Sequence, residues 1–166
     1  MKLEHVDPSD RKFHDWMRHY REEIDGETPP EEWLDAYLKV LFKDQGATRH
    51  IWWALDGGKR VGFAVAALQR GMVDGRSTAM IAEFFVYPEY RREGYGRRVA
   101  EAVIEFLRAA GAGEIYAAVV VGKVDVRGLR FWEACGFQLH RYSLVFRPEA
   151  RRALDEEEKE DEEDAL

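Results

Sequence analysis

Apolar side chains recur at three- and four-residue spacing near the N-terminus, and this spacing predicts two amphipathic helices. The first is expected from about Ser9 to Ile24. The second should begin at a capping box, Thr28–Glu31, with proline in its first turn, and end at Gly46. The apolar faces would be formed by Phe13, Trp16, Met17, Tyr20 and Ile24 on the first helix, and by Trp33, Leu34, Tyr37, Leu41 and Phe42 on the second.

Short runs of β-branched and aromatic residues follow and predict strands. Three strands are expected at His50–Leu55, Arg60–Gln69 and Ser77–Val86. The first two would be joined by a hairpin turn at Asp56–Lys59, where glycine supplies positive φ. Adjacent residues of a strand face opposite sides, so one tryptophan of the first strand could be exposed, or covered by a second subunit in a homodimer.

The second half of the chain alternates between helix and strand. After a glycine-rich stretch, the pattern predicts a helix from about Arg97 to Gly111 and a buried strand at Ile115–Val121. A short helix at Arg127–Cys135 and a last strand at Phe137–Phe146 complete the order ααβββαβαβ. This order predicts an α/β fold with a mixed sheet, antiparallel at first, with one parallel crossover.

Composition is that of one globular domain, since the chain has 166 residues of which 46% are hydrophobic and 34% are charged. Its longest apolar run, Ile115–Val121, is too short to span a membrane, and the first residues lack the apolar stretch of a signal peptide. The single cysteine, Cys135, excludes an internal disulfide. We therefore expect a cytoplasmic protein that is not attached to a membrane.

The net charge of −7 arises in the C-terminal segment Asp155–Asp164, which holds nine acids and one lysine. Such a run repels itself and rarely packs, so we expect a folded domain over residues 1–150 and a disordered acidic tail over residues 151–166. Without this segment, acids and bases nearly balance. A nucleic-acid partner is not expected, because nothing in the sequence requires a basic face.

A glycine- and arginine-rich segment lies between the third strand and the next helix, from Val86 to Gly96. Glycines let the backbone turn sharply and present N–H groups at a helix N-terminus, which favours phosphate binding. An ordinary turn with exposed arginines is the simpler alternative. A dinucleotide-binding motif is disfavoured, because Gly94-Tyr95-Gly96 lacks the third glycine and follows antiparallel strands, although Glu114 lies twenty residues further on.

Two motifs resemble those of the GNAT superfamily of N-acetyltransferases. One resembles the acetyl-CoA signature and reads Val86-x-Pro88-x-x-Arg91-x-x-Gly94-x-Gly96. The other resembles a later family pattern that has Asn, Ala and Tyr where this chain has Asp125, Gly128 and Trp132, and it reads Asp125-x-x-Gly128-x-x-Phe131-Trp132-x-x-x-Gly136-Phe137. The resemblance covers residues 48–147 and implies a sheet splayed between two central strands, with acetyl-CoA in the gap.

The resemblance also implies the cofactor contacts. The backbone of Phe84–Val86 would pair with the pantetheine arm, and an N–H near Phe85 or Val86 could stabilise the thioester oxyanion. The amides of Arg92 through Arg97 would hold the pyrophosphate. The full expected set is Phe84, Phe85, Val86, Arg91, Arg92, Glu93, Gly94, Tyr95, Gly96, Arg97, Asp125 and Trp132. No metal site is expected, because no spacing of His, Cys and acidic residues suggests one.

Glu83 is the candidate general base, because it is an isolated acid in an apolar strand and the family often carries an acid there. A solvated or arginine-paired glutamate is the alternative. The general acid is unclear: Trp132 stands in place of the usual tyrosine, and an indole N–H cannot protonate a thiolate. Tyr142, His140 or water could act instead, or coenzyme A could leave as a thiolate. Cys135 is interpreted as a packing residue.

The function that the resemblance implies is direct transfer of an acetyl group from acetyl-CoA to an amine. Acids in and beside the link between the first two helices suggest a small cationic amine or a lysine-bearing peptide as acceptor. They are Glu22, Glu23, Asp25, Glu27, Glu31 and Glu32. The helix dipole alone would explain the last two. A non-catalytic acetyl-CoA-binding domain is the alternative, which the missing tyrosine supports.

Overall fold

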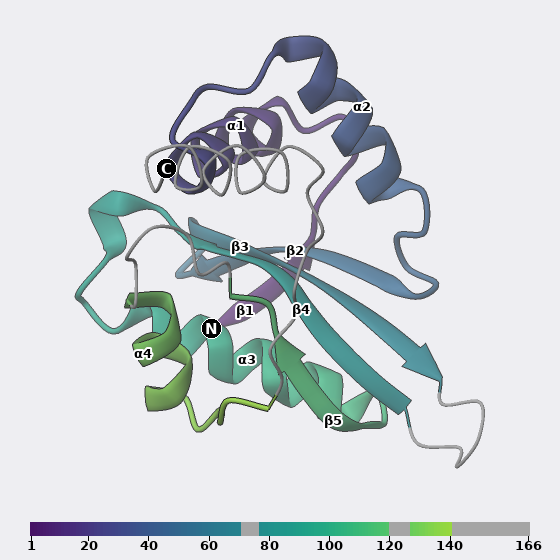
Figure 1. The fold of residues 1–166 in the computed structure, drawn as a ribbon, viewed down its shortest axis with the longest axis vertical. Coiled ribbons are helices and arrows are strands. Elements are labelled where there is room, and N and C mark those ends of the chain that lie inside the picture. The colour runs from purple at the N-terminus through teal and green to yellow at the C-terminus, as the bar shows by residue number, and fades with distance from the viewer. Residues whose placement is uncertain (71–76, 120–126, 141–166) are drawn as a thin grey trace, which may run out of the picture.

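Five strands in a mixed sheet form the centre of the molecule, in the order β1-β2-β3-β4-β5 (Figure 1). The structure is a computed structural model that describes residues 1–70, 77–119 and 127–140. The strands β1 (Lys2–His5), β2 (Arg49–Asp56), β3 (Lys59–Arg70) and β4 (Ser77–Val86) pair antiparallel, and β5 (Ala112–Ala117) pairs parallel with β4. The mixed α/β sheet with one parallel crossover is confirmed.

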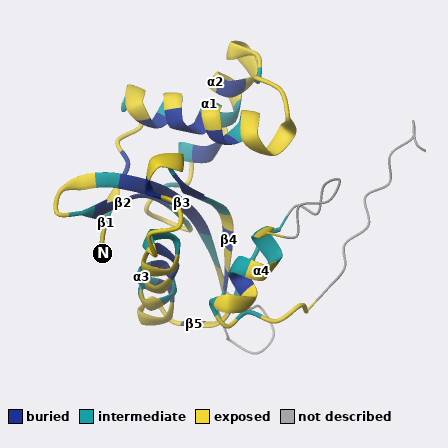
Figure 2. Cartoon of the chain, turned by 90° about the vertical axis from the view of Figure 1, so that its left-hand side faces the viewer, coloured by how far each residue is buried: buried dark blue, intermediate teal, exposed yellow. Residues whose placement is uncertain are grey.

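Helices cover both faces of this sheet (Figure 2). On one face lie α1 (Arg11–Asp25) and α2 (Glu31–Phe42), and on the other lie α3 (Tyr95–Ala109) and α4 (Arg127–Ala134). A short 3-10 turn, η1 (Pro88–Tyr90), connects β4 to the loop before α3. Among the described residues, no helix is both long and apolar enough to cross a membrane.

Each face of the sheet has its own hydrophobic core, and the adjacent tryptophans of β2 serve one core each. Trp53 packs edge-on against Phe13 and Trp16 of α1, with ring centroids 5.4 and 5.0 Å apart. Trp52 belongs to the core beneath α3 and contacts Phe106. The two side chains face opposite sides as predicted, but both are only 1% exposed. The expectation that one of them is exposed or covered by a second subunit was wrong, because helices cover both faces.

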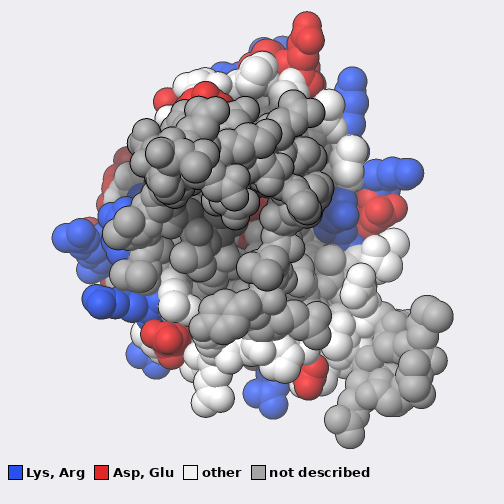
Figure 3. Space-filling model, in the orientation of Figure 1, with Lys and Arg blue, Asp and Glu red and all other residues white. Residues whose placement is uncertain are grey.

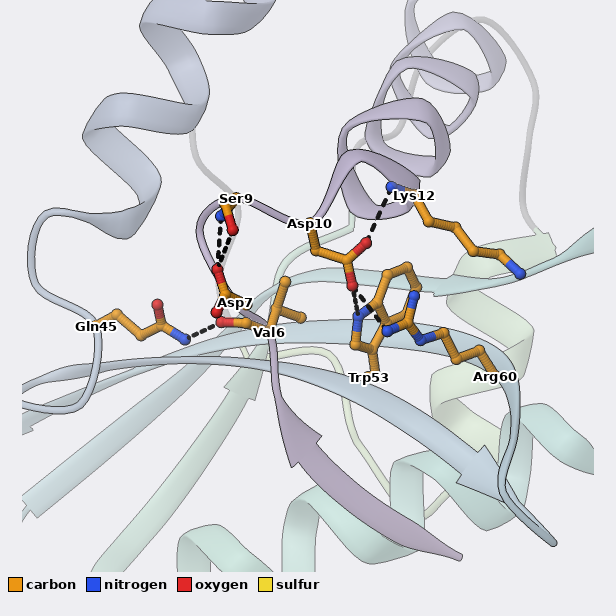
Figure 4. A network of polar contacts seen from close by, with 8 residues as sticks. All are labelled: Val6, Asp7, Ser9, Asp10, Lys12, Gln45, Trp53 and Arg60. Atoms are coloured by element: carbon orange, nitrogen blue, oxygen red, sulfur yellow. Dashed lines mark hydrogen bonds and ion pairs between the residues drawn. The ribbon is translucent and has the colours of Figure 1, made fainter.

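The start of α1 is fixed to the sheet by Asp10 (Figure 4). Its carboxylate accepts a hydrogen bond from the backbone N–H of Lys12, which caps the helix. The same carboxylate accepts a hydrogen bond from Trp53 Nε1 of β2 at 3.1 Å and forms an ion pair with Arg60 of β3 at 2.8 Å. One acidic side chain therefore sets where α1 lies across two strands.

The second helix departs from the sequence prediction at both ends. Pro30 occupies the N-cap and makes no side-chain capping bond, while the Thr28 hydroxyl instead donates to Glu22 of α1. The expected capping box is therefore wrong, and the helix ends at Phe42 rather than at Gly46. Trp33, which was placed on the apolar face, is 42% exposed.

The strands at the two ends of the chain also depart from the sequence prediction. β1 was not predicted, because Leu3 is its only aliphatic residue and its pairing with β2 is a long-range contact. The predicted last strand, Phe137–Phe146, shows no strand over residues 137–140, and its remainder lies outside the described residues. The proposed tail over residues 151–166 lies outside them as well.

β4 changes neighbours halfway along its length. It pairs with β5 only from Ser77 to Ile81, whose carbonyl accepts the N–H of Ala118 at 3.0 Å. Its pairing with β3 continues to Val86, with a register shift that leaves Ala82 without a partner residue on β3. The last part of β4 thus has a neighbour on one side only among the described residues, which is the splayed arrangement that the resemblance implied.

Replacing Gly62 of β3 by alanine should destabilise the fold, because its new Cβ would lie 2.3 Å from the backbone oxygen of Phe85 on β4. We expect the free energy of unfolding to fall by about 2–3 kcal/mol in denaturant titrations. Gly113→Ala on β5 is the matched control, since its nearest neighbour would be 3.7 Å away, and it should change stability by less than about 0.5 kcal/mol. Equal stability of the two variants would contradict the close approach of β3 and β4.

Candidate functional site

The open edge of β4 is the first component of the candidate site. The Tyr87 N–H donates to Val61 of β3 at 3.0 Å. Backbone groups alternate in direction along a strand, so those of Phe84 and Val86 point away from β3, toward the side where β5 no longer pairs. The Val86 carbonyl accepts a hydrogen bond from Arg91 Nε at 2.8 Å. Unpaired strand edges can bind an extended ligand through main-chain hydrogen bonds.

A turn with two left-handed residues leads from this edge into α3. Arg92 has φ of 64° and Gly94, the N-cap of α3, has φ of 81°. The N–H groups of the first turn, Tyr95–Arg97, find no acceptor in the part of the chain that the structure describes. Such N–H groups at the positive end of a helix dipole suit an anion. The expected phosphate loop is therefore placed at the end of the open edge.

Gly96 lies where α3 meets α4. A Cβ at this position would be 3.1 Å from the Phe131 ring, which is tighter than most side-chain contacts. Phe131 in turn packs against Phe84 of β4, with centroids 5.3 Å apart. The glycine thus allows α3, α4 and the end of β4 to approach closely.

Most arginines around this loop are engaged by acids. Arg91 makes a bidentate pair with Glu23 of α1, at 2.7 and 2.6 Å. Arg97 pairs with Glu101 at 2.9 Å, and Arg98 pairs with Asp56 of the hairpin at 2.5 Å. Arg92 is exposed and has no ion-pair partner among the described residues. The positive charge that is free to meet a phosphate is therefore smaller than the count of arginines suggested.

Glu83 lies at the bulge of β4. Ile81 belongs to the core beneath α3, and residues two apart normally face the same side of a sheet. The extra residue, Ala82, reverses this alternation, so Glu83 points toward α1 and α2. Its carboxylate accepts a hydrogen bond from the Tyr20 hydroxyl of α1, and another from the Tyr37 hydroxyl of α2 at 2.5 Å.

The two tyrosines remain protonated hydroxyl donors. Burial raises the pKa of Tyr20 far above its usual range, and the charge of Glu83 raises it further. Burial and Glu83 also raise the pKa of Tyr37. Sequence reasoning placed both residues on apolar helix faces and missed this role. A signal was available, because a buried tyrosine hydroxyl usually has a hydrogen-bond partner.

Trp132, the residue at the usual tyrosine position, is packed in the core. It is 6% exposed and lies between Phe84 and Phe137, with both centroid distances 5.0 Å. Cys135 lies in the same cluster, where burial raises the pKa of its thiol, consistent with a packing residue. The other residues assigned to this region, Asp125 and Tyr142, lie outside the described residues. His140 is exposed, and its ring lies 5.5 Å from that of Tyr116.

Three of the six acids in and beside the α1–α2 link form ion pairs, which the sequence did not reveal. Glu23 binds Arg91, and Asp25 binds Arg21 one turn earlier at 2.8 Å. Glu31 binds Arg18. On the visible part of the described surface, side chains of both signs are interspersed (Figure 3). The expected anionic rim is therefore neutralised at three of its six acids.

One further group of acids lies on the outer surface of α1 and α2. Ligand atoms of His14, Glu31 and Asp35 lie within 4.8 Å of one another. His14 Nε2 is 3.3 Å from Asp35, and Glu31 also contacts Arg18. Both acids are exposed, and the arginine already balances one of them. The sequence analysis, which found no metal-ligand spacing, did not identify this group.

The ion pair between Arg91 and Glu23 should couple α1 energetically to the loop that precedes α3. In a double-mutant cycle with Arg91→Met and Glu23→Gln, we expect a coupling of about 1 kcal/mol in unfolding free energy, decreasing at high salt. The control is the same cycle on an exposed ion pair within one helix, with Arg97→Met and Glu101→Gln. Its coupling free energy should be about 0.3–0.5 kcal/mol. A coupling at Arg91 no larger than this control would show that the bidentate contact is not maintained in solution.

Comparison with known proteins agrees with this geometry. The model of the "Acetyltransferase (GNAT) family" matches residues 11–137. A solved structure described as a putative acetyltransferase from Agrobacterium tumefaciens str. C58 superposes with a TM-score of 0.69 at 21% identity, over 89% of this chain and 99% of that chain. An aminoglycoside acetyltransferase from an uncultured soil metagenomic sample, in complex with sisomicin, superposes with a TM-score of 0.65 at 19% identity, over 88% of this chain and 93% of that chain.

A third solved structure, a transcriptional regulator from Bacillus halodurans C-125, superposes with a TM-score of 0.69 at 19% identity, over 88% of this chain and 98% of that chain. No curated protein matches the sequence significantly. Identities this low show a shared fold, whereas the family match spans most of the described chain. The chain belongs to the GNAT family of acetyltransferases.

Proposed function

We propose that this enzyme transfers the acetyl group of acetyl-CoA directly to a primary amine, with Glu83 as the general base. The observation that carries the proposal is the position of Glu83. Its carboxylate lies at the bulge where the open edge of β4 begins, and that edge leads to the unpaired N–H groups of α3. An acceptor amine at Glu83 and a thioester along the edge would meet at this point.

The described residues fit acetyl-CoA in two respects. The outward backbone groups of Phe84 and Val86 would pair with the amides of the pantetheine arm, as the resemblance implies. The N–H groups of Tyr95–Arg97, together with Arg92, would hold the pyrophosphate. Gly94 gives the turn its left-handed conformation, and Phe84 and Trp132 would border the acyl end.

In the proposed reaction, Glu83 removes a proton from the acceptor ammonium, directly or through one water. This step is needed because a lysine-like amine has a pKa of about 10.4. The amine nitrogen then forms a bond to the acetyl carbon as the carbon–sulfur bond breaks. An N–H of the β4 edge would stabilise the oxyanion. Coenzyme A leaves as a thiolate that takes a proton from water or from the predicted acid Tyr142, and the acetylated nitrogen releases its second proton to water.

For the acceptor, we propose an amine-bearing small molecule or a lysine-bearing peptide. The solved aminoglycoside acetyltransferase of similar fold was complexed with sisomicin, which supports a small amine. The paired acids of the α1–α2 link give less support than the sequence suggested. Glu27 and Glu32 are exposed and could still attract a cation. The lone cysteine supports a cytoplasmic location.

Coenzyme A should stabilise the protein through the α3 N-terminus. At a ligand concentration of about 100 times Kd, we expect the melting temperature to rise by roughly 5–11 °C. Gly94→Val should abolish this rise, because valine strongly disfavours the φ of 81° that presents the amides.

Gly111→Val is the matched control for that experiment. Gly111 also has a left-handed φ, 94°, but lies at the other end of α3. The Gly111→Val variant should have a lower melting temperature without ligand, and coenzyme A should raise that temperature by as much as in the wild type. A full rise in the Gly94 variant would exclude this loop as the phosphate site.

Replacing Glu83 by glutamine should lower acetyl transfer. The assay is thiol release from acetyl-CoA across a broad panel of amines, which also identifies the acceptor. With the best amine, kcat should fall about 10²–10⁴-fold and lose its dependence on pH in the acidic range, while KM for acetyl-CoA stays near the wild-type value. Wild-type kcat in this variant would end the role of Glu83 as base.

A further inference from the structure

We propose that Tyr20 and Tyr37 are positioning residues that act through Glu83, each holding one oxygen of its carboxylate. This inference rests on the proposed function, since it concerns how the general base is oriented. It assigns a role in the reaction to two residues of the α1–α2 layer that sequence analysis treated as core.

The contacts come from three separate elements. Oε2 of Glu83 accepts from Tyr20 of α1, and Oε1 accepts from Tyr37 of α2 at 2.5 Å. A carboxylate oxygen can accept two hydrogen bonds, so each oxygen retains one free lone pair. Held at both oxygens, the carboxylate cannot rotate without breaking a charge-assisted bond. One lone pair then stays directed at a fixed point where the amine, or a bridging water, can be bound.

The surroundings of the two hydroxyls differ. Tyr20 is buried and packs edge-on against Phe63 and Phe85, with centroids 5.4 and 5.5 Å away. Tyr37 is half-buried and stacks on the exposed Trp33 at 5.1 Å. Tyr20 is therefore the rigid support, and Tyr37 lies nearer to solvent, on the side from which an acceptor can approach.

Protonation favours a fixed direction of these hydrogen bonds. Burial and the charge of Glu83 raise the pKa of both tyrosines, so the hydroxyls stay protonated and can only donate to the carboxylate at working pH. Two other charged groups act on them: Arg21 of α1 on both tyrosines, and Arg49 of β2 on Tyr37. Neither arginine shows a hydrogen bond to Glu83 among the described contacts. The tyrosine hydroxyls are the groups that orient the base.

The test compares Tyr20→Phe and Tyr37→Phe with wild type, using the best amine of the panel. Each variant should lower kcat about 10-fold or more, because misplaced catalytic groups lose rate steeply, while KM for acetyl-CoA is unchanged. Melting temperatures should stay close to wild type.

Tyr116→Phe is the matched control, because the Tyr116 hydroxyl also bonds a glutamate, Glu114, at 2.5 Å on β5. It should leave kcat and the pH profile unchanged. In the Glu83→Gln background, adding Tyr37→Phe should cause little further loss, since both changes act through one carboxylate.

Three outcomes would each overturn a statement made above. If Glu83→Gln keeps wild-type activity, the proposed base is wrong. If Glu83→Gln is inactive but both phenylalanine variants keep the wild-type kcat, the base stands and the tyrosines do not orient it. If Tyr37→Phe lowers kcat by the same factor in the wild-type and Glu83→Gln proteins, Tyr37 affects activity by stabilising the fold and not by orienting Glu83.

Discussion

The loss of the parallel neighbour along β4 is the constraint on which the rest of the structure depends. Up to Ile81, β4 is an interior strand with its backbone groups shared between β3 and β5. Beyond that point only β3 remains paired in the described residues, and a bulge at Ala82 reverses the direction of the following side chain. One irregularity thus provides both an unpaired edge and an acid that faces α1 and α2. A regular strand would have placed Glu83 on the same face as Ile81, in the apolar core.

Sequence patterns over a few residues correctly predicted the elements that short-range interactions determine. The hairpin at Asp56–Lys59 was correct, because Gly57 and Gly58 take the positive φ that a tight turn requires. β4 was found with its observed bounds, since its sequence is continuously β-favouring. β1 was missed because its stability comes from pairing with β2, nearly fifty residues away. The capping box failed for a similar reason, since Thr28 found a partner on α1 instead.

The site was predictable in part. An isolated acid in an apolar strand pointed to Glu83, and the glycines pointed to the α3 N-terminus. The sequence could not show which acids are ion-paired. Glu23, for example, pairs with Arg91, which is 68 residues further along the chain. Tyr20 and Tyr37 were assigned to the core by helical periodicity alone. Periodicity reports which face of a helix is buried, but it does not report what the polar end of a buried side chain contacts.

Helix α1 connects the two halves of the proposed site. Tyr20 and Glu23 are three residues apart and therefore lie on one face of the helix. Tyr20 reaches Glu83 at one end of the open edge, and Glu23 reaches Arg91, whose Nε donates to Val86 at the other end. Phe85 lies between these contacts, against the Tyr20 ring and 5.2 Å from the Arg91 guanidinium.

Because α1 is also anchored to β2 and β3 through Asp10, its position relative to the sheet is fixed at both ends. A displacement of this helix would move the Glu83 carboxylate and Arg91, at the start of the loop before α3, together. The amphipathic pattern that predicts α1 as a cover for the sheet therefore understates its role. The polar residues at the border of its apolar face connect the proposed base, Glu83, to the open edge of β4.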